Sequence, residues 1–214
     1  MDIVQTLARS KIVPVAVFNN VDAALKTAEL LLEHSIFLLE VTMRTPAAPE
    51  CLKRVSREFP DLCVGAGSIL DVDSLDRSLD AGALFGVAPG LDEEVVDRAV
   101  SRGLPFVPGV ATPSELNRAL KKCRVIKVFP AQVMGGPDFI QAIAAPFKMK
   151  GFHLMPTGGI NEKNYLQYLA VDRVIACGMT YIVDGKLIEK GDYPALKVRM
   201  EEIARGLAAI KTGG

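Results

Sequence analysis

Short apolar runs recur along the whole chain, and stretches with helical periodicity separate them. The runs occupy residues 12–18, 36–41, 62–66, 84–88, 104–107, 125–129, 152–155 and 173–177. Most are continuously apolar rather than alternating, which is typical of parallel strands buried on both faces. Their spacing of about 20 to 27 residues matches one strand and one helix with their loops. The pattern therefore predicts eight β/α units around a parallel sheet.

The segments between the runs carry helix signals. Ala48, Cys51, Leu52 and Val55 fall on one helical face. The segment 112–115, Thr-Pro-Ser-Glu, is a capping box with proline at the first helical position. These signals place helices directly after the loops that follow the strands.

With 214 residues, half of them apolar, the chain can bury a full core as one domain. Eight near-equal units favour an α/β fold of the (β/α)8 TIM-barrel type, a single domain over residues 1–214 with a short N-terminal helix. An open doubly wound sheet is the alternative. It is disfavoured because little length remains for a reversal of strand order, and no Gly-x-Gly-x-x-Gly motif follows the first run.

Composition argues against several function classes. Lys and Arg number 25, as do Asp and Glu, so there is no overall positive charge to attract nucleic acid or an anionic membrane. No apolar run reaches the length of a membrane span, and the amino terminus lacks signal-peptide features, so we expect a soluble cytoplasmic protein. With two histidines and no Cys-x-x-Cys pair, we expect no metal site.

Lys127 stands in the middle of the apolar run 125–129. Lysine is rarely buried without compensation, so one interpretation is a strand-end residue whose ammonium reaches solvent. The other follows from chemistry, because a desolvated lysine loses its proton more readily and adds to carbonyls as a Schiff base. Polar residues at the ends of the other runs favour the second interpretation, a lysine-dependent carbonyl enzyme.

Glu40 is a carboxylate inside an apolar run, and Arg44 follows just beyond that run. Glu40 is either a structural partner for Lys127 or Arg44, or a general acid or base whose proton affinity is raised by a low dielectric. Arg44 offers a planar fork that matches a carboxylate, and a solvated loop arginine is its alternative interpretation.

The segment 156–161, Pro-Thr-Gly-Gly-Ile-Asn, leads from the seventh run into a helix. Glycines let the backbone approach an oxyanion, and a helix start supplies N–H groups. Gly178 and Thr180, after the eighth run, close the other side of this loop. Because phosphate sites of such barrels commonly follow strands seven and eight, the sequence predicts a phosphate cradle, with ordinary turn chemistry as the alternative.

Six ordered motifs closely resemble the 2-keto-3-deoxy-6-phosphogluconate (KDPG) aldolase family, which includes the 4-hydroxy-2-oxoglutarate (KHG) aldolases. They are EVTMRTP at 40–46, VGAGSIL at 64–70, APGL at 88–91, PGVATPSE at 108–115, KVFPA at 127–131 and PTGGI at 156–160. The resemblance runs from about residue 12 to about residue 182. It implies a class I aldolase, a lyase on a (β/α)8 barrel, that forms a homotrimer and works on a small 2-keto acid without metal or cofactor.

The resemblance also implies roles for individual residues. Lys127 would form the Schiff base and Glu40 would transfer protons. Arg44 and Ser68 would hold the pyruvate carboxylate, with Pro89 and Phe129 as pocket walls. The residues implied around the distal phosphate or its replacement are Thr157, Gly158, Gly159, Gly178 and Thr180.

Some positions depart from the pattern of the phosphogluconate enzymes. Ser68 stands where threonine is usual, Ala88 where serine often precedes Pro-Gly, and Gln132 where glutamate is frequent. Met179 stands where a glycine-rich loop is usual, and its Cβ is expected to restrict approach to an anion. Both KDPG and KHG therefore remain open as substrates. A phosphosugar isomerase or decarboxylase and a non-catalytic sugar-phosphate-binding barrel are the alternative functions, since a fold does not determine a reaction.

Overall fold

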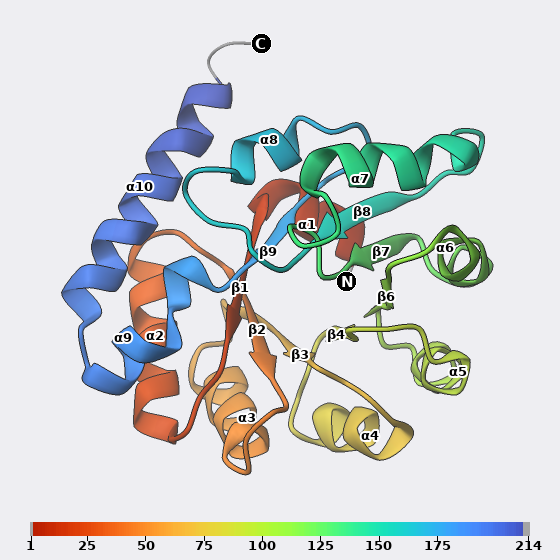
Figure 1. Ribbon diagram of the computed structural model, residues 1–214. Coiled ribbons are helices and arrows are strands. Elements are labelled where there is room, and N and C mark those ends of the chain that lie inside the picture. Colours follow the sequence, from red (N-terminus) through yellow and green to blue (C-terminus); the bar gives the residue numbers. More distant parts are fainter. Residues whose placement is uncertain (1, 212–214) are drawn as a thin grey trace.

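The parallel strands lie in the middle of the molecule, and most of the helices surround them (Figure 1). The structure, a computed structural model, describes residues 2–211. The strands are β1 (Ile12–Ala16), β2 (Leu38–Thr42), β3 (Cys63–Gly67), β4 (Gly86–Val87), β5 (Phe106–Val107), β6 (Gly109–Val110), β7 (Val125–Val128), β8 (His153–Pro156) and β9 (Cys177–Met179).

Helices follow most of the strands, which confirms the predicted β/α alternation and the short N-terminal helix. They are α1 (Ile3–Ser10), α2 (Val21–Glu33), α3 (Ala48–Glu58), α4 (Val72–Asp80), α5 (Glu93–Ser101), α6 (Pro113–Ala119), α7 (Gly136–Ala144), α8 (Tyr165–Leu169), α9 (Gly185–Lys190) and α10 (Tyr193–Lys211). The predicted capping box opens α6: Thr112 accepts from the backbone of Glu115, whose carboxylate accepts from the backbone of Thr112. Two reciprocal bonds of this kind satisfy amide groups that a helix start leaves unpaired.

The strands form two parallel sheets. One has six strands in the order β5-β4-β3-β2-β1-β9, and the other has the order β6-β7-β8. Only Pro108 separates β5 from β6, which is consistent with the missing N–H of proline interrupting a ladder. Parallel bridges between Leu154 and Val174, and between Thr157 and Gly178, connect the β8 segment with the chain around β9.

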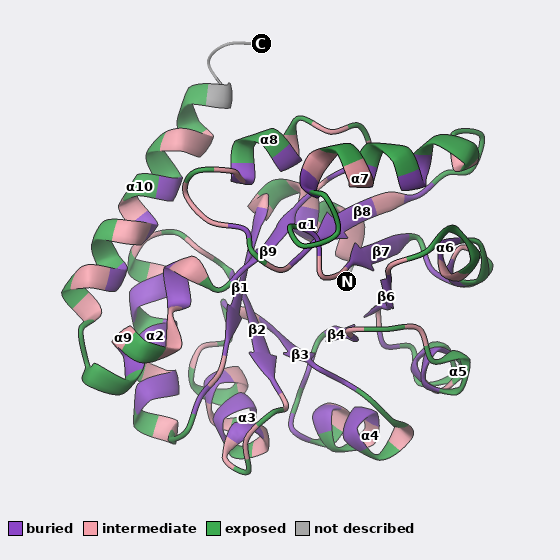
Figure 2. Cartoon of the chain, in the orientation of Figure 1, coloured by how far each residue is buried: buried purple, intermediate pink, exposed green. Residues whose placement is uncertain are grey.

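Alternate residues of the strands enter two different cores, which explains the continuous apolar runs. The inner core contains Val13, Val15, Leu38, Phe85, Val87, Val107, Val125, Met155 and Ala176, together with Leu7 of α1. The intervening residues, such as Leu39 and Val41 of β2, belong to a larger core that includes the buried faces of the helices. The strands are accordingly buried and the helices are exposed on their outer sides (Figure 2). This alternation decides which side chains enter the middle of the molecule.

Two sequence expectations are wrong in detail. The strand predicted from the run 173–177 is β9, which starts only at the last residue of that run, Cys177. Arg173 has a φ of 70°, and its guanidinium donates to the carbonyls of Lys148 and Lys150, so this part of the run is a turn. Residues 109–110, expected in a loop, form β6. The other predicted runs agree with strands to within two residues at either end.

Across residues 2–211, no helix is both long and apolar enough to cross a membrane. Within the same range, no group of three His, Cys, Asp or Glu side chains is placed to hold a metal ion.

Candidate active site

Glu40 and Lys127 meet above the inner core. Glu40 lies two residues after Leu38, and Lys127 two residues after Val125, so both side chains point to the face of their strand that forms this core. Lys127 Nζ lies 4.0 Å from Glu40 Oε1, and the two side chains are 4% and 1% exposed. The interpretation of Lys127 as a strand-end lysine in solvent is therefore wrong.

The surroundings of Glu40 favour proton transfer. Burial raises the pKa of the Glu40 carboxyl above its ordinary value, and the positive charges of Lys127 and Arg44 oppose this shift. Glu40 Oε2 has no hydrogen-bond partner among the described residues. A carboxyl with raised proton affinity and one free oxygen is suited to exchange a proton with a bound molecule or water.

A second polar pair lies at the ends of β2 and β3. Arg44 Nε donates a hydrogen bond of 2.7 Å to Ser68 Oγ. Ser68 has a φ of 58°, a left-handed conformation that non-glycine residues adopt rarely. The hydrogen bond orients the guanidinium, whose remaining N–H groups match a carboxylate.

The segment 157–159 forms a turn that requires glycine. Gly158 has a φ of 101° and Gly159 a φ of 76°, which a side chain would strain. Thr157 is buried, and its hydroxyl has no hydrogen-bond partner among the described residues. It packs directly against Gly178, where a Cβ would collide with the Thr157 hydroxyl.

One pocket of about 120 Å³ brings most of the predicted site residues together. Its walls are Val15, Val17, Thr42, Arg44, Lys127, Phe129, Thr157, Gly158, Gly159, Ile160, Gly178 and Thr180. The Phe129 ring lies against the amine, with its centroid 5.2 Å from Lys127 Nζ. Cationic and nucleophilic groups, an aromatic wall and a glycine turn thus surround one small volume.

Three predicted residues stand behind the pocket wall instead of lining it. Glu40 lies beside Lys127, and Ser68 accepts from Arg44. Pro89 packs against the backbone of Gly109, which pairs with Lys127 between β6 and β7. Glu40 and Ser68 therefore contact wall residues directly, and Pro89 supports Lys127 through Gly109.

The lining also includes residues that the sequence analysis did not select. Val15 and Val17 follow Val13 at intervals of two along the first run, and Thr42 follows Glu40 at the same interval. Alternate residues of a strand face the same side, so following this alternation from Val13 and from Glu40 to the strand ends would have identified all three.

Met179 does not restrict the site as expected. Its side chain is 1% exposed and packs in the larger core, which includes the buried faces of the helices, and Met179 is not among the residues that line the pocket. The alternation along β9 turns Gly178 toward the pocket and Met179 away from it.

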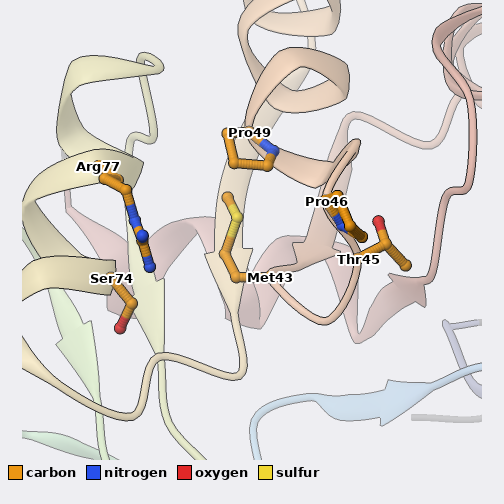
Figure 3. Close-up of a pocket in the computed structure, with 6 residues that line it drawn as sticks. All are labelled: Met43, Thr45, Pro46, Pro49, Ser74 and Arg77. Carbon is orange, nitrogen blue, oxygen red and sulfur yellow. The ribbon is translucent and has the colours of Figure 1, made fainter.

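A larger pocket of about 240 Å³ lies outside this site (Figure 3). It is lined by Met43, Thr45, Pro46, Pro49, Ser74 and Arg77. The hydroxyl of Ser74, which α4 contributes to this pocket, is already hydrogen-bonded to the backbone of Leu70 and Asp71. No carboxylate or lysine lines it, so we place the chemistry in the smaller pocket.

Comparisons with known proteins agree with this geometry. The family described as KDPG and KHG aldolase matches residues 3–198. A 2-dehydro-3-deoxy-phosphogluconate aldolase of Dickeya dadantii is 37% identical over 206 residues, covering 96% of each chain. A KHG/KDPG aldolase of Escherichia coli K12 is 35% identical, covering 94% of this chain and 93% of its own length.

A solved structure is similar over nearly the whole chain. It is KDPG aldolase from Legionella pneumophila, captured with pyruvate as a covalent carbinolamine intermediate. It has a TM-score of 0.87 and 34% sequence identity, and the match covers 92% of this chain and 95% of that one. With its buried Lys127 and Glu40, the glycine turn at 158–159 and these similarities, the chain belongs to the KDPG and KHG aldolase family.

Proposed function

We propose that the protein is a class I aldolase that cleaves KDPG to pyruvate and glyceraldehyde 3-phosphate, and that it also accepts KHG, giving pyruvate and glyoxylate. The observation that carries this proposal is the buried Lys127 amine 4.0 Å from the Glu40 carboxylate, in a pocket that also contains the turn at Gly158 and Gly159. The relatives named as KDPG and KHG/KDPG aldolases support it.

The chemistry starts with attack of Lys127 Nζ on the C2 ketone, and loss of water from the carbinolamine gives an iminium. Glu40, directly or through a water molecule, takes the proton of the C4 hydroxyl. The C3–C4 bond then breaks and its electron pair moves into the iminium, which gives the aldehyde and a pyruvate enamine. Protonation of the enamine and hydrolysis release pyruvate and return the amine. Because the iminium is itself the electron sink, the cycle needs no external cofactor or metal.

The other residues bind and orient the substrate. Arg44 holds the carboxylate of the 2-keto acid, and Ser68 contributes through Arg44, because the hydrogen bond between them orients the guanidinium that lines the pocket with Lys127. Phe129 excludes water from the amine, and Pro89 supports the wall from behind through the backbone of Gly109. The residues proposed around the distal phosphate are Thr157, Gly158, Gly159, Gly178 and Thr180.

We propose in addition that the two parallel sheets are arcs of one closed (β/α)8 barrel; of the predicted domain over residues 1–214, residues 1 and 212–214 lie outside the described residues. The single residue between β5 and β6 and the bridges from the β8 segment to the chain around β9 support closure at both gaps. A homotrimer remains a prediction from the family resemblance. A phosphorylated sugar acid does not cross a bilayer unaided, which supports a cytoplasmic location.

The function is tested by measuring pyruvate release from KDPG and from KHG. We expect pyruvate from both, with the lower KM for KDPG, because its phosphate reaches the glycine turn. An isomerase would convert phosphosugars without releasing pyruvate. A binding protein would retain KDPG without turnover, and either result would contradict the proposal.

Gly67 provides a test of the position of Glu40. A Cβ on Gly67 would collide with Glu40 Oε1, and the buried carboxylate has little room to move. We expect Gly67→Ala to lower kcat by about 10-fold or more and to destabilise the fold by about 1–3 kcal/mol, because overpacking displaces Glu40. Steady-state kinetics and thermal unfolding measure both effects.

Gly185→Ala is the matched control for this substitution. A Cβ at Gly185 meets nothing within 4 Å, so we expect wild-type kcat from it. A Gly67→Ala enzyme with wild-type kcat would show that the position of Glu40 is not critical.

A further inference from the structure

The glycine turn is held from outside the pocket by a second set of polar side chains. Gln132 lies in the loop between β7 and α7, and Asn164 and Tyr168 lie at the start and in the body of α8. Helices α7 and α8 are neighbours among the helices that surround the strands (Figure 1). None of these three side chains lines the pocket.

Both carbonyls of the turn are bonded to this set. The backbone N–H of Gln132 donates to Gly158 O at 3.0 Å, and Asn164 Nδ2 donates to Gly159 O at 3.0 Å. The stem of Gln132 packs on Gly159 so closely that a Cβ there would overlap it. The turn is therefore fixed by its carbonyls and by contact, on the side away from the pocket.

One oxygen joins the set together. Gln132 Oε1 accepts from Tyr168 Oη at 2.9 Å and from Asn164 Nδ2 at 3.1 Å. Tyr168 is fully buried, so it anchors the exposed Gln132 to the core. Asn164 Oδ1 accepts from the backbone of Asn161 at 2.9 Å, which fixes the amide that reaches Gly159 O.

Two amide groups of the turn are left for a ligand. The N–H of Gly158 belongs to the bridge between Thr157 and Gly178. Among residues 2–211, the N–H groups of Gly159 and Ile160 donate to no protein acceptor, and both residues line the pocket. Successive unpaired N–H groups in such a turn form a concave site for an anion.

We propose that Gln132 is a positioning residue for the phosphate end of the substrate: its side chain, anchored by Tyr168, orients the Asn164 amide that holds the carbonyl of Gly159. The side-chain oxygen of Gln132 thereby keeps the Gly159 carbonyl turned outward and the amide groups of Gly159 and Ile160 available to the phosphate. This inference rests on the proposed function, because it assumes that the phosphate binds at the turn.

The test compares Gln132→Ala, Gln132→Glu and Tyr168→Phe with wild type on KDPG and on KHG, which has no phosphate. We expect Gln132→Ala to raise the KM for KDPG about 10-fold, since hydrogen bonds to one acceptor are lost. Its kcat for KDPG and its KM for KHG should stay within about twofold of wild type, because Lys127 and Glu40 are untouched. A general loss of structure would instead change both substrates alike.

Gln132→Glu is the conservative variant. A carboxylate oxygen accepts the same two donors, and its added charge is screened at an exposed position, so the KM for KDPG should return to within about threefold of wild type. Tyr168→Phe removes one donor to the same oxygen, and the double variant with Gln132→Ala should be no worse than Gln132→Ala alone. Gln141→Ala, an exposed glutamine of α7, is the matched control and should behave as wild type.

Three other outcomes separate the two proposals. Suppose that wild type has the lower KM for KDPG. If Gln132→Ala then leaves the KM for KDPG unchanged, or raises the KM for both substrates equally, the positioning role of Gln132 is wrong, while the proposed aldolase function is unaffected. If wild type cleaves both substrates with equal KM, phosphate does not bind at the turn and the inference falls with it. If wild type releases no pyruvate from either substrate, the proposed function itself is wrong.

Discussion

Replacing Lys127 by alanine is expected to abolish borohydride trapping of pyruvate and to lower cleavage by about 10⁴-fold or more, as expected for loss of a covalent nucleophile. In wild type, reduction of the imine leaves a pyruvyl adduct that peptide mapping should place on Lys127. We expect the adduct on Lys127 because its amine lies in the pocket, against the Phe129 ring. Intact mass followed by peptide mapping is the measurement.

The Lys127→Ala variant also leaves the Glu40 carboxylate buried without its partner, which can destabilise the fold. Lys127→Met is therefore made in parallel, because it fills nearly the same volume without an amine. Lys121→Ala removes an exposed lysine from the same part of the chain and should trap pyruvate as wild type does. An adduct on folded Lys127→Met, or one that maps to a different lysine in wild type, would contradict the assignment.

Replacing Glu40 by glutamine is expected to lower kcat by about 10²- to 10⁴-fold while pyruvate is still trapped on Lys127. Glutamine has the shape of glutamate but cannot accept the proton of the C4 hydroxyl, and positioned acid–base groups contribute about this factor. Single-turnover cleavage and borohydride trapping, measured on the same preparation, separate bond breaking from imine formation. An equal loss of both steps would indicate that Glu40 only supports Lys127 structurally.

The pH profile provides a second readout for Glu40. Burial raises the pKa of its carboxyl, and a base must be deprotonated to act. As the pH falls through this raised pKa, Glu40 gains a proton and the rate falls, so the acid limb of kcat should lie above the ordinary range of a glutamate. The residual activity of Glu40→Gln should lack this limb. If both enzymes share the same acid limb, another group is responsible for it.

Much of the site could be predicted because polar residues and glycines within or just after an apolar run indicate the end of a strand. Lys127 and Glu40 interrupt apolar runs, and Gly158 and Gly159 follow shortly after the run 152–155. In parallel β/α units such positions lie at one end of the sheet. The residues that were missed, Val15, Val17 and Thr42, carry no such mark, because apolar or small side chains near a strand end are common whether they face a pocket or not.

The expectation for Met179 failed for a different reason. Its effect on an anion site depends on which face of β9 it occupies, and the strand begins at Cys177, the last residue of the run from which its position was inferred. A shift of one residue exchanges the two faces of a strand. The turn at Arg173 that delays the strand depends on contacts with the carbonyls of Lys148 and Lys150, which are distant along the chain.

The amino-acid sequence by itself determined the β/α alternation, the chemical types of the site residues and the family to which the chain belongs, because periodicity, capping and motifs are local properties. Only the tertiary structure decided that Lys127 lies 4.0 Å from Glu40, that Ser68 acts through Arg44, and that Gln132 reaches Tyr168 and Asn164. These relations depend on how separate strands align and how helices pack over them. Both are set by the burial of many side chains together, so no single segment specifies them.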